Sequence, residues 1–382
     1  MGNGNFSFGK HVLIPFASGV IGASCVLGIN YGVQNSGIFN KNNSNILISE
    51  ESRAPISTTS QVSINNYSDT ATSVAEKILP SVVGIKVEYS VSSIFYRGES
   101  TATAEGSGVI ISEDGYILTN NHVVDTSTSS YFYNVSEANK VTIHLYNDDT
   151  EYEGTIVGTD ELTDLAVIKI DKTGLTAASL GDSDSSKVGE FVMAVGNPLS
   201  LQSSISAGII SAVNRKVTSD GKTFTLIQTD TAINSGNSGG ALVNADGKVI
   251  GINTLKLSGD GVEGIGFAIP INSAKPIYEQ LIQYNKVKRP YIGINGRDIN
   301  EQTAKTYNLV EGVYILSVNE FSPAEKAGIK IGDVITEIDG KQLKTISELN
   351  EIKNTYSIGD KITIKLYRSG EYHDISLTLE EQ

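Results

Sequence analysis

The segment Gly236-Asn237-Ser238-Gly239-Gly240 places a serine between glycines in a chain of 382 residues. A serine nucleophile needs a hydroxyl exposed on a tight turn, with backbone N–H groups aimed at the oxygen that becomes negative during the reaction. Glycines on both sides permit such a turn and let a substrate carbonyl approach closely. The same residues also suit an ordinary β-hairpin turn. The segment therefore indicates an acyl-transfer enzyme only if a base and an orienting acid occur elsewhere.

Only four histidines are available as the base. His11 flanks an apolar segment, His373 lies close to the C-terminus, and His144 sits within a strand-like run. His122 follows Tyr116-Ile117-Leu118-Thr119-Asn120-Asn121, a predicted strand that ends in a polar turn. A lone histidine is more often structural than catalytic, but His122 is the one well placed in the part of the chain that holds Ser238.

The third member of a triad must accept a hydrogen bond from the imidazole and hold its orientation. Asp164 stands at the start of the apolar run Leu165–Ile170, and Asp160 is a nearby alternative. The order His122, Asp164, Ser238 is that of chymotrypsin and differs from the orders in subtilisin and the α/β-hydrolases. The sequence thus predicts a chymotrypsin-like arrangement.

The middle of the chain consists mainly of short runs rich in β-branched residues, bounded by Gly, Asp, Asn or Pro, which predicts an all-β barrel or sandwich. These runs are Val82–Val87, Gly108–Ile111, Tyr116–Leu118, Val141–Tyr146, Leu165–Ile170, Phe191–Val195, Lys248–Ile252 and Gly266–Ile269. Short helices are expected over Ala71–Leu79, before Pro80, and over Asn272–Tyr284, with Asn272 or Ser273 as cap.

A second folded unit is expected after the polar hinge Lys286–Pro290. Its predicted strands are Val313–Val318, Val334–Ile338, Ile362–Tyr367 and Ile375–Leu379, and its predicted helices are Pro323–Ala327 and Ser347–Tyr356. A chain of this length is expected to hold two domains.

The N-terminal region has a different character. Val12–Ile29 carries no charge and follows Lys10, and its 18 residues suffice to cross a bilayer as a helix. We expect an uncleaved anchor with Lys10 in the cytoplasm and the rest of the chain outside. A cleaved signal peptide and a buried soluble helix remain alternatives, and a lipidation site at Cys25 is weaker. Residues 34–70, rich in Asn, Ser and Thr, are expected to form a flexible tether.

Composition excludes several classes of function. The net charge of −14 and the lack of a basic cluster argue against nucleic acid as a partner. One cysteine permits no intrachain disulfide, and with four histidines it supplies no recognisable metal-ligand set. The sequence contains no phosphate-binding loop, so we expect neither a metal nor another cofactor.

Five segments together resemble the HtrA/DegP family of serine proteases, in the family's order. They are Gly106-Ser107-Gly108-Val109-Ile110, Thr119-Asn120-Asn121-His122-Val123, Thr163-Asp164-Leu165-Ala166-Val167, Gly236-Asn237-Ser238-Gly239-Gly240 and Gly264-Ile265-Gly266-Phe267-Ala268-Ile269-Pro270. The resemblance runs from about residue 72 to the C-terminus and departs from the family at Ser235 and Ala241, where many members carry proline.

This resemblance implies a mainly β fold, in which a chymotrypsin-like double β-barrel protease domain is followed by a small α+β PDZ domain. The expected boundaries are 1–33 for the stub and anchor, 34–70 for the tether, 71–285 for the protease and 286–382 for the PDZ domain. It implies catalysis by His122, Asp164 and Ser238. The oxyanion hole is expected from backbone N–H groups of Gly236 and Ser238, with Asn237 as a further candidate.

Further roles follow from the resemblance. Ile265, Phe267 and Ile269 are expected to form an aliphatic substrate pocket, and Asn253, Thr254 and Leu255 to pair with the substrate backbone. Tyr291-Ile292-Gly293-Ile294 resembles the loop of a PDZ domain that captures a peptide C-terminus. Arg215, which otherwise reads as a solvated surface residue, is expected to relay ligand binding to the catalytic loops, with Lys216–Lys222 as a loop beside it.

Two classes of function remain open. The intact triad favours an ATP-independent endopeptidase that acts on misfolded or exported proteins at the outer face of the cell membrane. A chaperone or scaffold that holds unfolded chains is the alternative, and the family combines both. Asn237 carries no charge that could pair with a newly freed N-terminus, so activation by loop rearrangement is the expected switch. Trimers are the family's usual assembly.

Overall fold

The computed structural model describes residues 64–93, 96–125, 128–129, 133–198, 203–219, 222–234, 236–254 and 264–381. The predicted membrane anchor and most of the predicted tether lie outside this range. None of the helices that it describes is long and apolar enough to span a membrane.

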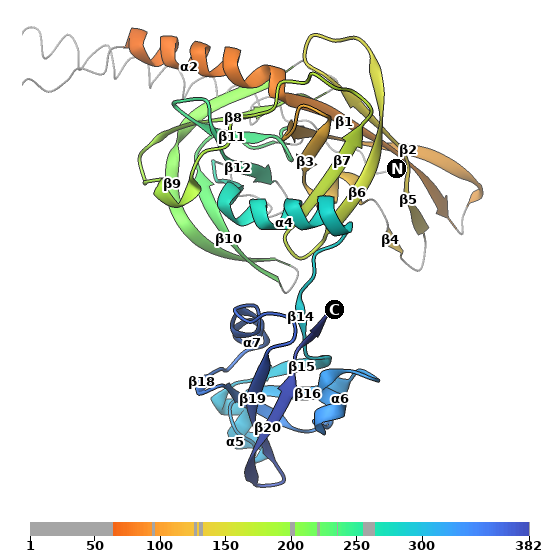
Figure 1. Cartoon of the computed structure of the whole chain (residues 1–382), viewed down its shortest axis with the longest axis vertical. Coiled ribbons are helices and arrows are strands. Elements are labelled where there is room, and N and C mark those ends of the chain that lie inside the picture. Colours follow the sequence, from red (N-terminus) through yellow and green to blue (C-terminus); the bar gives the residue numbers. More distant parts are fainter. Residues whose placement is uncertain are drawn as a thin grey trace, which may run out of the picture. The chain divides into compact units, whose positions relative to one another are not determined.

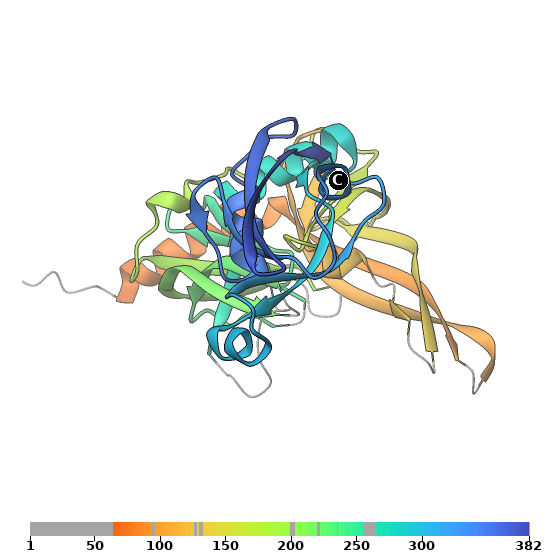
Figure 2. The ribbon, with the colours of Figure 1, turned by 90° about the horizontal axis from the view of Figure 1, so that it is seen from below.

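The first β-structure contains seven strands in the order β1-β2-β3-β7-β6-β5-β4, and an additional pairing between β1 and β5 closes six of them on themselves. The strands are β1 (Val82–Ser93), β2 (Tyr96–Ile110), β3 (Tyr116–Thr119), β4 (Thr128–Ser129), β5 (Tyr133–His144), β6 (Glu151–Asp160) and β7 (Leu165–Ile170). Alternate apolar residues such as Val83, Ile85 and Val87 fill its interior. β1, β2 and β5 are longer than the sequence suggested, and their outer parts extend away from the barrel (Figure 2).

The second β-structure is a closed barrel in the order β10-β13-β12-β11-β8-β9. Its strands are β8 (Phe191–Gly196), β9 (Ser204–Ser219), β10 (Lys222–Thr229), β11 (Ala241–Asn244), β12 (Val249–Thr254) and β13 (Gly266–Pro270). One large core cluster joins both barrels, because Leu118 and Leu165 of the first pack in it with Ile252 and Phe267 of the second. The double barrel predicted from the sequence is therefore confirmed (Figure 1).

Two helices pack against this shared core (Figure 1). α4 (Ile271–Tyr284) contributes Tyr278 and Leu281, and burial raises the pKa of the Tyr278 phenol. α2 (Ile64–Ile78) buries Val74 and Ile78, and continues into a short 3₁₀ turn at Leu79–Ser81. α2 begins seven residues before the expected helix, so the end of the segment predicted as tether is helical.

The C-terminal region forms a six-stranded sheet, in which β15-β16-β17-β19-β20 follow one another and β18 pairs with β17, and a separate pair β14–β21. Its strands are β14 (Pro290–Tyr291), β15 (Ile294–Ile299), β16 (Gly312–Val318), β17 (Val334–Ile338), β18 (Lys341–Gln342), β19 (Lys361–Arg368), β20 (Glu371–Thr378) and β21 (Glu380–Glu381). Its helices are α5 (Glu301–Tyr307), α6 (Pro323–Ala327) and α7 (Ile346–Lys353). β15 and α5 were not anticipated from the sequence. Side chains of Asn300, Ser322 and Thr345 cap the three helices.

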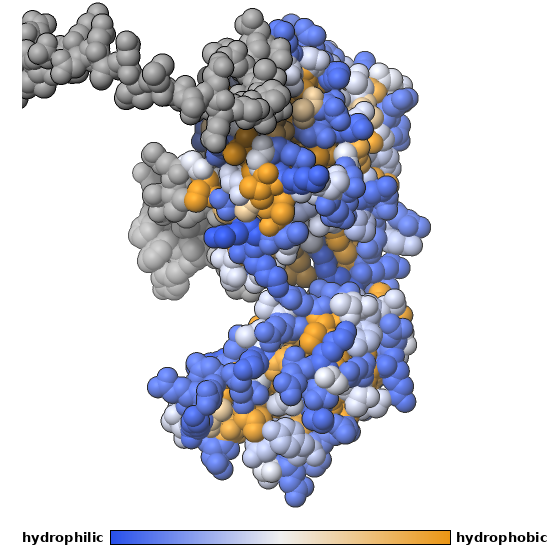
Figure 3. All heavy atoms as spheres, turned by 90° about the vertical axis from the view of Figure 1, so that its left-hand side faces the viewer, coloured by the Kyte–Doolittle hydropathy of each residue, from blue (hydrophilic) through white to orange (hydrophobic). Residues whose placement is uncertain are grey.

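The predicted loop Lys216–Lys222 was wrong. β9 continues to Ser219 and β10 begins at Lys222, so most of this segment belongs to a long antiparallel ladder in which Thr218 pairs with Thr223. In this exposed strand pair, polar residues alternate with partly buried ones, and such a pattern resembles the sequence of a polar loop. The face of the molecule in Figure 3 is mainly hydrophilic, with separate hydrophobic patches.

Candidate active site

His122 and Asp164 come from neighbouring segments of the first barrel. His122 lies on the single-turn helix α3 (Asn121–Val124) after β3, and Asp164 lies in the turn between β6 and β7. The imidazole Nδ1 is 2.8 Å from Oδ2 and 3.0 Å from Oδ1 of Asp164. The backbone N–H of His122 also donates to Oδ1 at 3.1 Å. Asp164 is only 2% exposed, so water does not compete for this carboxylate, which holds the imidazole in its orientation.

Ser238 completes the arrangement from the second barrel. Its Oγ is 3.0 Å from Nε2 of His122, which is hydrogen-bonding distance for proton transfer. Gly236 and Gly239 adopt φ angles of 104° and 80°, a region open mainly to glycine. The structure therefore joins the three predicted residues in one chain of hydrogen bonds from carboxylate to imidazole to hydroxyl. Such a chain can activate a serine for attack on a carbonyl carbon.

Two other side chains also touch this chain: that of Asn120, for which no role was predicted, and that of Thr254, whose predicted pairing with the substrate backbone stays a prediction. The Thr254 hydroxyl donates to Oδ2 of Asp164 at 3.1 Å and is fully buried. Asn120 donates through Nδ2 to the carbonyl of Asp164 at 3.0 Å, and its Oδ1 is 3.3 Å from Oγ of Ser238. Asn120 directly precedes α3 and lies in the same sequence motif as His122. Its position two residues before the base was the one sequence feature that could have indicated a role at the site.

Asn237 has a different role from the one expected. Its backbone N–H donates to the carbonyl of Asn234 at 3.1 Å, which removes it as an oxyanion donor in this structure. Its side chain donates to the carbonyl of Ala232 and accepts from the N–H of Asn234, both at 3.0 Å. Asn237 therefore holds the preceding loop against the nucleophile turn, because a carboxamide can donate and accept at once.

Asp160, the alternative to Asp164, faces another partner. Both of its oxygens accept hydrogen bonds from the guanidinium of Arg289, at 2.8 and 2.6 Å, and the two side chains are 7% and 14% exposed. Its Oδ2 also accepts from the N–H and the hydroxyl of Thr163. Asp160 thus holds the turn that carries Asp164 and is not itself bonded to the imidazole.

The predicted substrate contacts are only partly described. The prediction that Asn253 pairs with substrate is wrong, since its N–H donates to the carbonyl of Gly240 and its carbonyl accepts from the N–H of Gly239. Leu255 lies outside the described residues. Among the expected pocket residues, Phe267 and Ile269 belong to the shared core and Ile265 is 37% exposed. The pocket stays a prediction.

Arg215 is an exposed residue of β9 opposite Leu226 of β10. The preceding Asn214 has a φ angle of 53°, and the ladder register shifts at this point, which indicates a β-bulge. Within the described ranges, no group of three or more His, Cys, Asp or Glu residues is placed to hold a metal ion.

In the C-terminal domain, the segment Tyr291–Ile294 lies against the chain before α6. The carbonyls of Ile292 and Gly293 accept hydrogen bonds from the N–H groups of Ala324 and Asn319, both at 2.9 Å. Gly293 has a φ angle of 88°, and a side chain there would collide with Ser322. Ile292 and Gly293 therefore form a hydrogen-bonded link between β14 and the edge strand β15.

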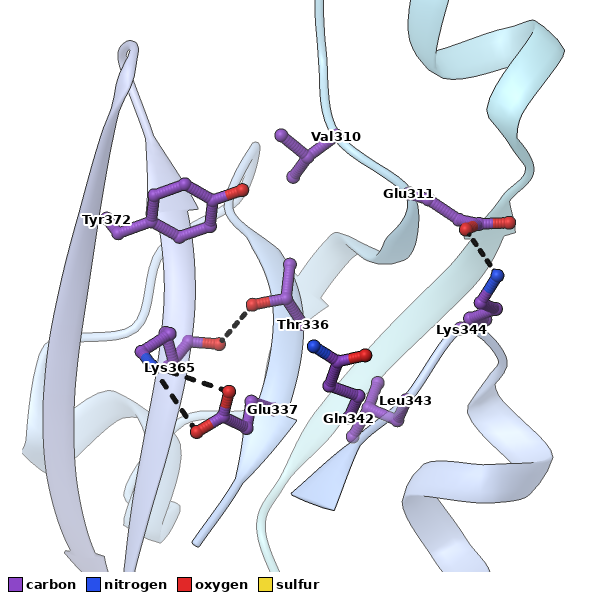
Figure 4. A pocket seen from close by; sticks show the side chains of 9 residues that line it. All are labelled: Val310, Glu311, Thr336, Glu337, Gln342, Leu343, Lys344, Lys365 and Tyr372. Carbon is purple, nitrogen blue, oxygen red and sulfur yellow. Dashed lines mark hydrogen bonds and ion pairs between the residues drawn. The ribbon is translucent and has the colours of Figure 1, made fainter. Parts of the chain in front are cut away.

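A cavity of about 620 Å³ lies elsewhere in this domain, beside β17, β18 and β19 (Figure 4). Its charges are paired with one another: Lys365 with Glu337 at 3.3 Å and Lys344 with Glu311 at 2.7 Å. The hydroxyl of Thr336 donates to the Lys365 carbonyl. None of the residues that line this cavity belongs to the triad.

Two family patterns match the chain. Residues 106–252 match the trypsin-like peptidase domain, and residues 290–379 match the PDZ domain. Over 396 residues the chain is 39% identical to the serine protease Do-like HtrB of Bacillus subtilis (strain 168), covering 97% of this chain and 82% of the relative. The chain belongs to the HtrA family of serine proteases.

Other HtrA relatives agree. The periplasmic serine endoprotease DegP of Escherichia coli (strain K12) is 37% identical over 349 residues, covering 80% of this chain and 71% of DegP. The solved structure of the HtrA-type protease AlgW with a decapeptide superposes with a TM-score of 0.67 at 32% identity, covering 82% of this chain and 98% of AlgW. The serine endoprotease from Yersinia pestis gives a TM-score of 0.62 at 35% identity, covering 82% and 98%. This HtrA chain is a serine endopeptidase, and its hydrogen-bonded His122, Asp164 and Ser238 are consistent with the catalytic triad.

Proposed function

We propose that this HtrA protease degrades misfolded or exported proteins outside the cytoplasmic membrane, without ATP. The observation that carries the proposal is the unbroken hydrogen-bond chain from Asp164 through His122 to Ser238. The extracytoplasmic location is supported by relatives such as DegP, which is named a periplasmic serine endoprotease. Unfolded chains suit a serine endopeptidase because an extended backbone can bring its peptide bond to the nucleophile, whereas the backbone of a folded protein is held in its own structure.

The proposed reaction follows from the geometry. Oγ of Ser238 attacks the scissile carbonyl carbon while Nε2 of His122 takes its proton and later passes it to the leaving amine. Asp164 holds Nδ1–H and stabilises the imidazolium. Backbone N–H groups of Gly236 and Ser238 stabilise the oxyanion. Water then hydrolyses the acyl-enzyme by the reverse proton transfers.

The PDZ domain is proposed to bind peptide C-termini and so to regulate the protease. β15 is an edge strand of its sheet, so an extended peptide can add to it as a further strand. Ile346, Leu349 and Ile352 of α7 pack on the domain's core, and the N–H of Ile346 donates to Asp298 of β15 at 2.7 Å. This bond holds the start of α7 beside the edge strand, and the Tyr291–Ile294 segment lies at the start of β15.

The test compares casein turnover by purified wild-type protein and by the Ser238→Ala variant. We expect the variant to lose activity by several orders of magnitude with an unchanged unfolding temperature, because the nucleophile is removed without loss of packing. Retained turnover in Ser238→Ala would show that another group carries the chemistry. The physiological substrates are then identified by comparing cleavage-generated protein N-termini in cells that carry the wild-type protein and in cells that carry Ser238→Ala. If none of these new N-termini came from exported proteins, the quality-control role would be refuted.

Two features of the whole protein belong to the same proposal. Residues 12–29 are proposed to anchor the protein with its catalytic domain outside, and the protein is proposed to form trimers, as the family resemblance implies. Protease added to intact cells should then remove the catalytic domain, whereas a mature N-terminus just after Ser24 or Cys25 would mean a cleaved signal. A single-subunit mass in solution would contradict the trimer.

A further inference from the structure

Ser107 is a fully buried serine of the first barrel whose polar groups all face the nucleophile turn or its supports. It lies between Gly106 and Gly108 in β2, and no role in the triad or the oxyanion hole accounts for it. A buried hydroxyl is costly unless it is hydrogen-bonded, so its partners indicate what it does.

Four hydrogen bonds connect Ser107 to its surroundings. Its N–H donates to the carbonyl of Ser238 at 2.9 Å, and its carbonyl accepts from the hydroxyl of Thr119 at 2.7 Å. Its Oγ accepts from the N–H of Asn197 at 2.8 Å and is 2.5 Å from the carbonyl of Gly236. Because the Asn197 N–H can only donate and the Gly236 carbonyl can only accept, the hydroxyl proton points to Gly236.

The Gly236–Asn237 peptide is consequently held at both ends. Its carbonyl accepts from Ser107, and its N–H donates to the carbonyl of Asn234 at 3.1 Å. The plane of this peptide sets ψ of Gly236 and φ of Asn237, which direct the turn toward Ser238. Gly236 alone does not fix its ψ angle, because a residue without a Cβ has few steric limits on its backbone conformation. The Ser107 hydroxyl therefore supplies a restraint that Gly236 lacks.

We propose that Ser107 is a positioning residue for catalysis, which holds the Gly236–Asn237 peptide so that no carbonyl turns toward the developing oxyanion. A rotated peptide would place a carbonyl dipole where the reaction needs N–H donors. Ser107 acts from the first barrel on a turn of the second, so it also aligns the nucleophile with His122. The inference concerns the endopeptidase chemistry itself and does not depend on the physiological substrate.

The test measures kcat and KM of the full-length Ser107→Ala variant with a chromogenic peptide, together with inhibition by a peptide boronic acid that mimics the tetrahedral intermediate. Loss of a direct oxyanion donor costs roughly 100- to 1000-fold in kcat. Since Ser107 acts through Gly236, we expect a fall of about 10- to 100-fold in kcat, an equal weakening of boronate binding and a KM within about 2-fold of the wild type.

Ser183→Ala is the matched control. Ser183 is also a buried serine of the protease domain, and its Oγ accepts from the N–H of Asn272 at 3.1 Å, at the start of α4. The Ser183→Ala variant should lose about as much stability as Ser107→Ala and keep the kcat of the wild type. If kcat falls as far in Ser183→Ala as in Ser107→Ala, Ser107 has only a structural role.

A second variant protects the test against misfolding. Ser107→Cys fills nearly the same volume with a much weaker donor, and we expect its kcat to fall between those of wild type and Ser107→Ala. A folded Ser107→Ala or Ser107→Cys protein with wild-type kcat and boronate affinity overturns the proposal.

Discussion

Asp164 shows how one backbone conformation assigns a role to one of two carboxylates. Its φ angle of 57° is left-handed, which few non-glycine residues adopt, and the conformation lets its carbonyl and carboxylate both face the segment that carries His122. Asp160, four residues earlier, forms the Arg289 ion pair that holds the turn. One aspartate therefore serves the chemistry and the other supports it.

These two aspartates should respond differently to the same substitution. Asp164→Asn should lower kcat by about 10⁴-fold, because an amide favours the wrong tautomer of the imidazole. Asp160→Asn leaves Arg289 without its charged partner, so it should lower the free energy of unfolding by about 3–5 kcal/mol and reduce kcat far less. Steady-state hydrolysis of a peptide and urea unfolding measure the two effects. A larger loss of kcat in Asp160→Asn than in Asp164→Asn would reverse the assignment.

The triad could be predicted from the sequence because its residues lie in short local motifs with a recognisable order. The contacts made by the side chains of Asn120, Thr254 and Ser107 could not be predicted, because they join segments far apart in the chain. The wrong pairing role of Asn253 has the same origin. Its backbone groups are occupied by Gly239 and Gly240, a register that only the closed barrel determines.

At the scale of elements, the turn at Gly236–Gly240 depends on a close approach between two barrels. Gly239 has a φ angle of 80°, and a Cβ there would collide with the carbonyl of Ser107 and the hydroxyl of Thr119. Gly174 has a similar φ angle of 71°, but no atom lies within 4 Å of its potential Cβ. Comparing these two glycines therefore distinguishes the cost of a left-handed backbone, which both share, from the cost of a steric clash, which only Gly239 has.

Gly239→Ala should therefore abolish peptide hydrolysis and lower the unfolding temperature by more than Gly174→Ala does. A left-handed φ costs a non-glycine residue about 1–2 kcal/mol at either site, and only Gly239 adds a clash next to Ser238. Differential scanning fluorimetry and kcat measure both variants. Equal effects of the two substitutions would mean that the segments around Gly239 move apart at little cost in free energy.

Long elements were the least predictable from the sequence. β9 and β10 extend past the expected loop because exposed strands such as Lys216–Ser219 alternate polar and partly buried residues, which gives no continuous apolar run. The predicted helix was shorter than α2 for a related reason. The sequence of α2 is mostly polar, and only one of its faces, which includes Val74 and Ile78, is buried. The barrel class followed from composition and turns, whereas strand length was decided by pairing with neighbours.

At the scale of the whole molecule, the paired strands β8 and β9 connect the proposed regulatory residue to the catalytic turn. Gly196, the last residue of β8, and Pro198 lie against the turn, and a Cβ on Gly236 would be 2.7 Å from Pro198. Arg215 stands in β9, beside the bulge at Asn214. We propose that peptide binding changes the strand at this bulge and that Arg215 passes the change to the catalytic turn.

Arg215→Ala should keep a weak basal cleavage rate that an activating peptide no longer raises. A coupling of about 1–3 kcal/mol corresponds to a 5- to 150-fold effect of peptide on the wild type. Arg215→Lys should restore little, because lysine lacks the planar fork of donors. Peptide titrations of all three proteins under identical conditions measure the coupling. Normal activation of Arg215→Ala would return Arg215 to an ordinary solvated surface residue.

The division of the active site between two barrels has a consequence for the timing of biosynthesis. His122 and Asp164 leave the ribosome before Ser238, so a growing chain first contains a base without a nucleophile. Ser238 becomes reactive only when its barrel has closed on itself and docked against the first through contacts such as Ser107–Gly236. A chain whose second barrel has not yet closed therefore lacks a nucleophile in place beside His122.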